Sequence, residues 1–346
     1  IWVKFRVTSA GLLTDHDVII WTTTPWTIPQ NRAVCYNPGI TYGIYEVVGR
    51  PEECWARIGD RYLIADKLAE EVFARARLDV QNPDLVRRLR DVSAEELSGL
   101  VMSHPLRGAE GAGGEWDYDV PMLPGDHVTD DAGTGFVHTA PSHGDDDYQI
   151  GQKHGLPMTY NVMEDGSFRA DLPLFGGKSI LTAQGKEGDA NTAVIEALIA
   201  AGKLLARGRH KHSYPHSWRS KAPLIYRNTP QWFAAIDKPV GDGLDTYGRT
   251  IRERALTSID QLVTWTPKTG RNRLFSMIEA RPDWVLSRQR AWGVPLTCFV
   301  RKGAKPSDAD FLLRDPKVNA RILEAFGAEG ADAWYRPGAK ERFLGN

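Results

Sequence analysis

The chain has 346 residues, enough for two or three domains with a sizeable core. Its formal net charge is −1, and its 42% hydrophobic and 25% charged residues are ordinary values for a globular protein. This balance excludes a chain-wide basic field, so nucleic acid would have to be bound by local patches. No apolar run approaches membrane-spanning length, there is no signal-peptide pattern, and Cys35, Cys54 and Cys298 lack metal or disulfide spacing, so we expect a cytoplasmic protein with no membrane partner.

In chain order, hydrophobic periodicity and turn residues predict a series of short elements. Strands are expected at 2–8, 18–24, 41–48 and 133–139, and helices at 65–78, 145–154, 192–201, 250–263 and 270–278. Residues 107–119 are rich in glycine and predict a surface loop, whereas the glycines and prolines of 237–248 are typical of a connector. Strands interleaved with a few helices, without regular βαβ repetition, indicate an α+β, β-rich fold.

The segment 19–33 runs from an apolar strand into three threonines and then into a turn bounded by Pro25 and Pro29. Threonine suits a strand, and the alternation of strand side chains puts Thr22 and Thr24 on one side and Thr23 on the other. The prolines prevent a regular ladder directly afterwards. This pattern predicts a strand end that presents hydroxyls beside a rigid loop, although an ordinary Thr-rich strand before a Pro turn has the same pattern.

A second polar segment holds His138, His143 and the run Asp145–Asp147 within ten positions. Ser142 lies three residues before Asp145, which is a helix-start signature, and Gly155 supplies a helix stop. Three interpretations follow from these residues: a capped helix whose acidic first turn favours the dipole, a metal site, and a metal-free polar pocket. Consecutive aspartates at a helix start fan outward, which disfavours the metal site.

The segment 207–221 carries five basic residues, no acidic ones, and an interleaved Tyr and Trp. Such a mixture can hold phosphates and stack on bases. The alternative is a solvated basic face with a buried Trp.

Three segments in order, 19–33, 133–148 and 284–295, closely resemble motifs of the isoleucyl-tRNA synthetase family of class I. The sequence Trp-Thr-Thr-Thr-Pro-Trp-Thr at 21–27 favours the isoleucyl member over its valyl and leucyl relatives. The resemblance implies a fragment with an editing (connective polypeptide) domain, built as a distorted β-barrel with flanking helices, plus a partial segment of the Rossmann-like catalytic domain. The expected domains are 1–236 for editing, 237–280 as a helical connector, and 281–346 as a partial return to the catalytic domain with the start of a second insertion.

The resemblance also implies site residues. Asp147 would hold the α-ammonium group of a misattached amino acid, because a charge-assisted bond to a cation is short and strong. His138 would line the side-chain end of the pocket and block the larger substrate. The residues around the ester and the terminal adenosine would be Thr22, Thr23, Thr24 and Asn31. No catalytic role passes to Asp145 or Asp146.

The implied reaction is hydrolysis of valine from isoleucine tRNA, with isoleucine excluded, and it needs no metal or cofactor. Burial of the one extra methylene of isoleucine changes the binding free energy by only roughly 1–3 kcal/mol, so a second site that admits valine and excludes isoleucine is required. The parent enzyme would use ATP and Mg²⁺ to ligate isoleucine, but neither class I nucleotide motif nor a phosphate-binding loop occurs in this chain.

Contacts with tRNA are expected from six residues of the chain: Trp26, Arg209, Lys211, Trp218, Arg219 and Trp232. Many relatives carry a Cys-x-x-Cys pair where this chain has Ser217 and Ser220, so no zinc site is expected there. A monomer is expected. The alternatives are the valyl relative's editing domain clearing threonine, a metal-dependent hydrolase using His138, His143 and Asp145–Asp147, and a tRNA-binding module without turnover.

Overall fold

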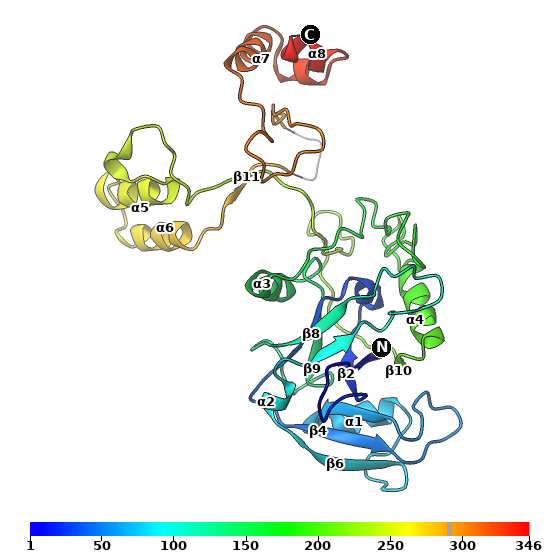
Figure 1. Cartoon of the computed structure of the whole chain (residues 1–346). Helices are drawn as coiled ribbons and strands as arrows, with labels where there is room; N and C mark the ends of the chain where they lie inside the picture. Colours follow the sequence, from blue (N-terminus) through cyan, green and yellow to red (C-terminus); the bar gives the residue numbers. More distant parts are fainter. Residues whose placement is uncertain (289–292, 346) are drawn as a thin grey trace. The chain divides into compact units, whose positions relative to one another are not determined.

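The computed structural model describes residues 1–288 and 293–345. The chain forms two compact units, Ile1–Asn228 and Thr229–Asn346, which are described separately (Figure 1). The chain has a mixed α+β, strand-rich architecture, as the sequence predicts. Within the described ranges, every helix is too short or too polar to cross a bilayer.

The first unit contains a six-stranded sheet with the strand order β10-β1-β2-β5-β4-β6. The strands are β1 (Trp2–Arg6), β2 (Asp17–Trp21), β4 (Tyr42–Val47), β5 (Arg61–Ala65), β6 (Val86–Val92) and β10 (Leu204–Ala206). β2 and β5 pair in parallel, and the other neighbours are antiparallel. The strands expected in the first 50 residues are therefore confirmed, and each is shorter overall than the sequence pattern.

A four-stranded sheet of order β7-β8-β3-β9 completes the β-structure of this unit. Its strands are β3 (Ala33–Tyr36), β7 (Val101–Ser103), β8 (Asp119–Pro124) and β9 (Phe136–Thr139). An isolated bridge between Val7 and Met102 links the end of β1 to β7. The ladder does not continue from this bridge, so the described strands form two open sheets and the expected distorted barrel is wrong.

The core follows from the alternation of strand side chains. In β2, Val18 and Ile20 join the apolar cluster shared by the two sheets, whereas Ile19 joins the cluster on the opposite face of the larger sheet. Helix α1 (Ala69–Arg75) covers that second face with Val72 and Phe73. A strand buried on both faces reads as a continuous apolar run, which is what Val18–Ile20 shows.

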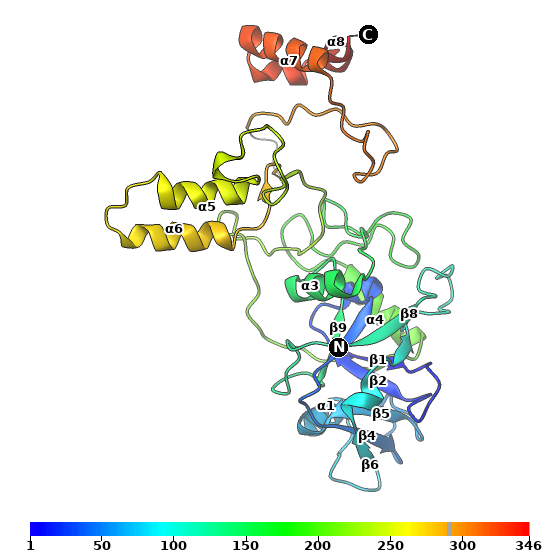
Figure 2. The same cartoon turned by 60° about the vertical axis from the view of Figure 1, so that its left-hand side comes forward.

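Further helical segments of the first unit are η1 (Pro25–Gln30), η2 (Asp66–Leu68), α2 (Ala94–Leu97), α3 (Asp145–His154) and α4 (Ala190–Ala200). Helices α3 and α4 are labelled in Figure 2. The helices expected at 65–78, 145–154 and 192–201 are confirmed. Helix α3 ends at Gly155 in the left-handed conformation, with φ of 65°. Its N-cap is Gly144, and Ser142 instead donates its hydroxyl to the carbonyl of Thr159 at 2.7 Å.

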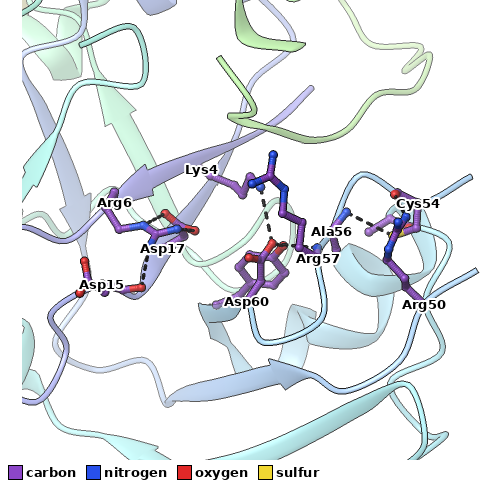
Figure 3. Close-up of polar contacts among 11 residues, drawn as sticks. Lys4, Arg6, Asp15, Asp17, Arg50, Cys54, Ala56, Arg57 and Asp60 are labelled. Atoms are coloured by element: carbon purple, nitrogen blue, oxygen red, sulfur yellow. Dashed lines mark hydrogen bonds and ion pairs between the residues drawn. The ribbon is translucent and has the colours of Figure 1, made fainter. Parts of the chain in front are cut away.

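A polar network ties β1 to β2 (Figure 3). Arg6 donates from Nε and Nη2 to the two carboxylate oxygens of Asp17, each at 2.8 Å, and the Asp17 side chain is 1% exposed. Lys4, also buried, lies 3.6 Å from the carboxylate of Asp60. A buried carboxylate that accepts two hydrogen bonds from one guanidinium stabilises the fold, since removing either side chain would leave the charge of the other without a partner.

Asp17→Asn is expected to lower the free energy of unfolding by about 1–3 kcal/mol, because it removes charge-assisted hydrogen bonds from a buried site. Urea unfolding of the chain measures this. The matched control is Asp15→Asn in the turn just before β2, where the side chain is exposed and Arg6 contacts only the backbone carbonyl. Equal effects of the two substitutions would contradict the role given to the Arg6–Asp17 pair.

The second unit holds a two-stranded sheet and two groups of helices. Strands β11 (Phe233–Ala234) and β12 (Trp284–Val285) pair antiparallel, and α5 (Ile251–Gln261) lies beside α6 (Thr269–Glu279). A small core is formed by α7 (Pro316–Glu329), η4 (Ala331–Tyr335) and α8 (Ala339–Leu344). The helices expected at 250–263 and 270–278 are confirmed.

The Rossmann-like segment expected from 281 onward is not confirmed. A Rossmann-like fold needs neighbouring parallel strands, and β12 has two residues and an antiparallel partner. Residues 289–292 of the motif at 284–295 lie outside the described residues.

Candidate active site

A cavity of about 390 Å³ in the first unit brings together residues from distant parts of the sequence. Thr22 and Thr23 come from the turn after β2, His138 from β9, and Asp147 from the first turn of α3. Four of the six expected catalytic residues therefore line one cavity. Its remaining wall consists of Trp21, His127, Thr129, Ala132, Gly133, Gly135, Phe136 and Val137.

The three threonines lie in a turn and not in a strand, because β2 ends at Trp21. The expected alternation nevertheless holds: the Thr22 and Thr24 hydroxyl oxygens are 3.2 Å apart, and the Thr24 N–H donates to the Thr22 hydroxyl at 3.1 Å. Thr22 is buried, whereas Thr23 is exposed at the cavity. The turn thus offers one fixed and one accessible hydroxyl to a ligand.

His138 is 8% exposed, and both of its ring nitrogens have protein partners. Asn31 Nδ2 lies 3.4 Å from Nδ1, and Thr27 Oγ1 lies 3.0 Å from Nε2. Since the amide donates, Nδ1 accepts and Nε2 carries the proton, while the Thr27 hydroxyl donates to the carbonyl of Thr24 at 2.9 Å. Burial lowers the pKa of His138 to about 4, so the ring is neutral at pH 7 and forms a fixed wall.

Asn31 and Thr24, the other two expected catalytic residues, do not belong to the cavity lining. Asn31 is fully buried and donates from Nδ2 to the carbonyl of Ala33 at 2.8 Å as well as toward His138. Its Oδ1 is buried with no hydrogen-bond partner. In this geometry Asn31 positions the imidazole and does not contact the cavity itself.

Three side chains hold η1, the segment that carries Thr27 and leads to Asn31. His104 Nε2 donates to the carbonyl of Ile28 at 2.9 Å, and Trp116 Nε1 donates to the carbonyl of Pro29 at 2.9 Å. The Tyr118 hydroxyl donates to the carbonyl of Asn31 at 2.7 Å. Trp116 is fully buried, so the segment 107–119 is only in part the surface loop expected from its glycines. The sequence signal for this support is a pair of aromatic residues inside a Gly-rich loop.

Asp147 is the third residue of α3 and its carboxylate accepts a hydrogen bond from the backbone N–H of Ala140 at 2.9 Å. Burial is the largest influence on this group and raises its pKa to about 6, with a further rise from the charge of Asp146. Asp145 and Asp146 are exposed, and Asp145 accepts from Gln149 Nε2 at 3.1 Å. Of the three aspartates, Asp147 alone lines the cavity.

His143 lies outside the cavity lining, with Nδ1 bonded to the carbonyl of Tyr226 at 2.8 Å and its ring edge-on to Trp26 at 5.0 Å. Across residues 1–288 and 293–345, no three His, Cys, Asp or Glu side chains converge as a metal site requires. The geometry therefore separates the side chains that a metal-dependent hydrolase would need to bring together.

A family model described as tRNA synthetases class I (I, L, M and V) matches residues 11–319. The chain belongs to this family. It is 66% identical to an isoleucine–tRNA ligase of Ruegeria pomeroyi, an alignment that covers 100% of this chain and 36% of that protein. The isoleucine–tRNA ligase of Bradyrhizobium diazoefficiens is 51% identical over 100% of this chain and 35% of its own. The chain spans about a third of the length of these relatives.

Solved structures similar to the chain include leucyl-tRNA synthetase domains. The crystal structure of GlLeuRS-CP1 is similar with a TM-score of 0.31 at 18% identity, and the alignment covers 40% of this chain and 43% of that one. The editing domain of the P. knowlesi cytosolic leucyl-tRNA synthetase is similar with a TM-score of 0.31 at 17% identity, covering 40% and 52%.

In this synthetase chain, the residues expected to contact tRNA lie in several places. Arg209 lines a second cavity beside the first, and Lys211 is exposed. Trp218 is 75% exposed with the Arg219 guanidinium 4.6 Å from its ring centre, so a solvated face with a buried Trp is wrong for this segment. These exposed groups are arranged as stacking and cationic surfaces.

The two other tryptophans lie elsewhere. Trp26 is 5% exposed and belongs to the core, and its backbone N–H donates to Asn191 Oδ1 at 3.0 Å. Trp232 belongs to the second unit and stacks on Phe311 with ring centres 6.1 Å apart. Sequence reasoning missed His127 and Thr129 in the cavity wall, and their loop has no periodicity that could have identified them.

Proposed function

We propose that this chain forms the editing site of an isoleucyl-tRNA synthetase and hydrolyses valine from mischarged isoleucine tRNA. The observation that carries the proposal is the cavity in which Thr22, Thr23, His138 and Asp147 meet. Membership of the synthetase family and similarity to isoleucine–tRNA ligases along the whole chain support it. Ligation of isoleucine to tRNA with ATP and Mg²⁺, by the full-length parent, belongs to the same proposal.

In the proposed reaction, the Asp147 carboxylate holds the α-ammonium group of the amino acid and so fixes the ester in the cavity. Water adds to the ester carbonyl carbon, the bond to the ribose oxygen breaks, and the proton passes to that oxygen, giving valine and uncharged tRNA. The accessible Thr23 hydroxyl and the fixed Thr22 hydroxyl orient the water and donate to the developing oxyanion. This route uses no covalent intermediate and no metal.

His138 sets the size limit in this scheme. Its ring is held by Thr27 and Asn31, and both nitrogens are occupied, so it contributes shape and not proton transfer. A rigid wall can admit valine and exclude isoleucine, because the extra methylene has nowhere to go. Discrimination of this kind is worth roughly 1–3 kcal/mol.

The chain is expected to hydrolyse the valyl ester of isoleucine tRNA about 10- to 200-fold faster than the isoleucyl ester. Release of labelled amino acid from each charged tRNA measures the two rates. Equal rates would contradict the second sieve, and a preference for the threonyl ester would favour the valyl relative. Loss of activity with a chelator, restored by Zn²⁺, would favour the metal-dependent hydrolase.

ATP is not expected to bind this chain at micromolar concentration, because both class I nucleotide motifs are absent from its sequence. Isothermal titration calorimetry with ATP and Mg²⁺ tests this. Uncharged isoleucine tRNA is the positive control in the same cell. A measurable binding enthalpy with ATP at these concentrations would show that the chain has a nucleotide site without the class I motifs.

A further inference from the structure

A second cavity, of about 330 Å³, adjoins the candidate active site. The two cavities share Trp21, Thr22, Thr23, Ala132 and Gly133. We propose that this second cavity binds the base of the nucleotide that precedes the terminal nucleotide of the tRNA. The inference rests on the proposed function, because the second cavity adjoins the one that would hold the ester of the terminal nucleotide.

The cavity has the aromatic wall that a nucleobase requires. The rings of Trp2 and Trp21 lie 6.2 Å apart with a 37° tilt, and His210 meets Trp21 edge-on at 5.1 Å. Trp2 is buried, and its Nε1 donor has no hydrogen-bond partner. The Arg75 guanidinium lies over the ring of buried Trp2, 5.8 Å from its centre, so a base that enters would stack on Trp21 and His210. A carbonyl oxygen of the base could then accept a hydrogen bond from Trp2 Nε1.

The charges in the cavity favour a base over a phosphate. Glu71 and Glu187 both line it, and a phosphate between them would be repelled, whereas exocyclic amines of cytosine or adenine donate to carboxylates. Arg75 is already paired with Glu71 at 3.2 Å. Arg209 lines the same cavity and is exposed, and no carboxylate of the described residues lies within 4 Å of it. The phosphate would therefore stay at Arg209 while the base enters.

A row of rings continues outward from the cavity along an extended segment. His210 and His212 stack at 5.8 Å, His212 meets Tyr214 at 6.1 Å, and Tyr214 meets His216 at 6.2 Å. Residues two apart in extended chain point to one side, so these rings form one surface. Such a surface suits successive unpaired bases regardless of their identity.

The test is binding of an uncharged RNA hairpin that carries the tRNA 3′ single strand, measured by fluorescence anisotropy at fixed salt. A second hairpin lacks the base at the position before the last. Removing that base, or changing His210→Ala in the full 346-residue chain, is expected to weaken binding about 5- to 150-fold. The combined change is expected to cost no more than the larger single one, because both remove the same contact. His154→Ala, an exposed His at the end of α3, is the control and is expected to bind as the parent does.

Independent, multiplying effects of the two changes would overturn the proposal, as would equal affinity of the intact and abasic hairpins. His212→Ala repeats the test one ring further out, with the next base removed. Deacylation of valyl-tRNA is measured in parallel. If the two changes have non-additive effects on binding but the chain does not deacylate valyl-tRNA, only the proposed function is wrong. If the chain deacylates valyl-tRNA but the two effects are independent, only this inference is wrong.

Discussion

Asp147→Asn is expected to reduce kcat/KM for hydrolysis of the valyl ester by roughly 30- to 4,000-fold. Removing one partner of a buried, hydrogen-bonded charge pair costs about 2–5 kcal/mol, and the substrate ammonium would lose its carboxylate. The amide keeps an oxygen that can accept from the N–H of Ala140, so the start of α3 remains intact. Deacylation of valyl-tRNA by purified variant and parent measures the loss.

The pH dependence follows from the raised pKa of Asp147, about 6, compared with 3.8 for an ordinary aspartate. Only the ionised carboxylate holds an ammonium group, so kcat/KM is expected to fall as the pH drops through 6. The stability effect has the opposite sign, because the folded state holds this proton up to a higher pH than the unfolded chain. Stability from the protonated group is present below pH 3.8 and is lost as the pH rises through 6.

Asp147→Asn should therefore abolish this limb of the pH profile and leave the protein at least as stable as the parent at pH 7. Asp145→Asn is the matched control, since Asp145 is exposed on the same helical turn and bonds Gln149. If Asp145→Asn lowers the rate as strongly as Asp147→Asn, the single-carboxylate assignment is wrong. If added divalent cations restored the activity of either variant, the metal-dependent hydrolase would be favoured.

Local signals predicted much of the fold that surrounds the site. The apolar run Val18–Ile20 predicts a strand, which the structure buries on both faces, and Gly155 predicts the end of α3, where it takes the left-handed conformation. Pro25 and Pro29 announce a break after the threonines, which the structure realises as the 3₁₀ segment η1. Each of these signals depends on neighbours in sequence, where backbone propensity is decisive.

Long-range pairing escaped prediction for a physical reason. The isolated bridge between Val7 and Met102 joins residues almost a hundred positions apart, and no local propensity encodes such a pairing. The parallel pairing of β2 with β5 likewise joins residues that are far apart in the sequence, such as Asp17 and Tyr62. The support of η1 by His104 and Trp116 likewise depends on tertiary packing, since a Gly-rich segment has no period from which burial could be inferred.

His138→Ala is expected to let the chain hydrolyse the isoleucyl ester, with a loss of discrimination of about 10- to 200-fold. The ring lines the cavity, and its removal leaves room for more than one methylene. Because the change also removes the hydrogen bonds of the ring with Thr27 and Asn31, a cost of about 1–3 kcal/mol in stability is expected, and rates are compared at a temperature where both proteins are folded.

Measuring both esters separates the size role of His138 from a chemical role. A general base would slow both esters together, typically by a factor of about 10²–10⁴, and leave their ratio unchanged. The structure argues against that outcome, because Nε2 donates to Thr27, Nδ1 accepts from Asn31, and the pKa of about 4 leaves a weak base. His143→Ala is the control: burial lowers the pKa of this His to about 4 as well, but it lies outside the cavity lining, and the variant is expected to keep the parent's selectivity. If His138→Ala also keeps the parent's rate and selectivity, His138 is only a packing residue at the end of β9.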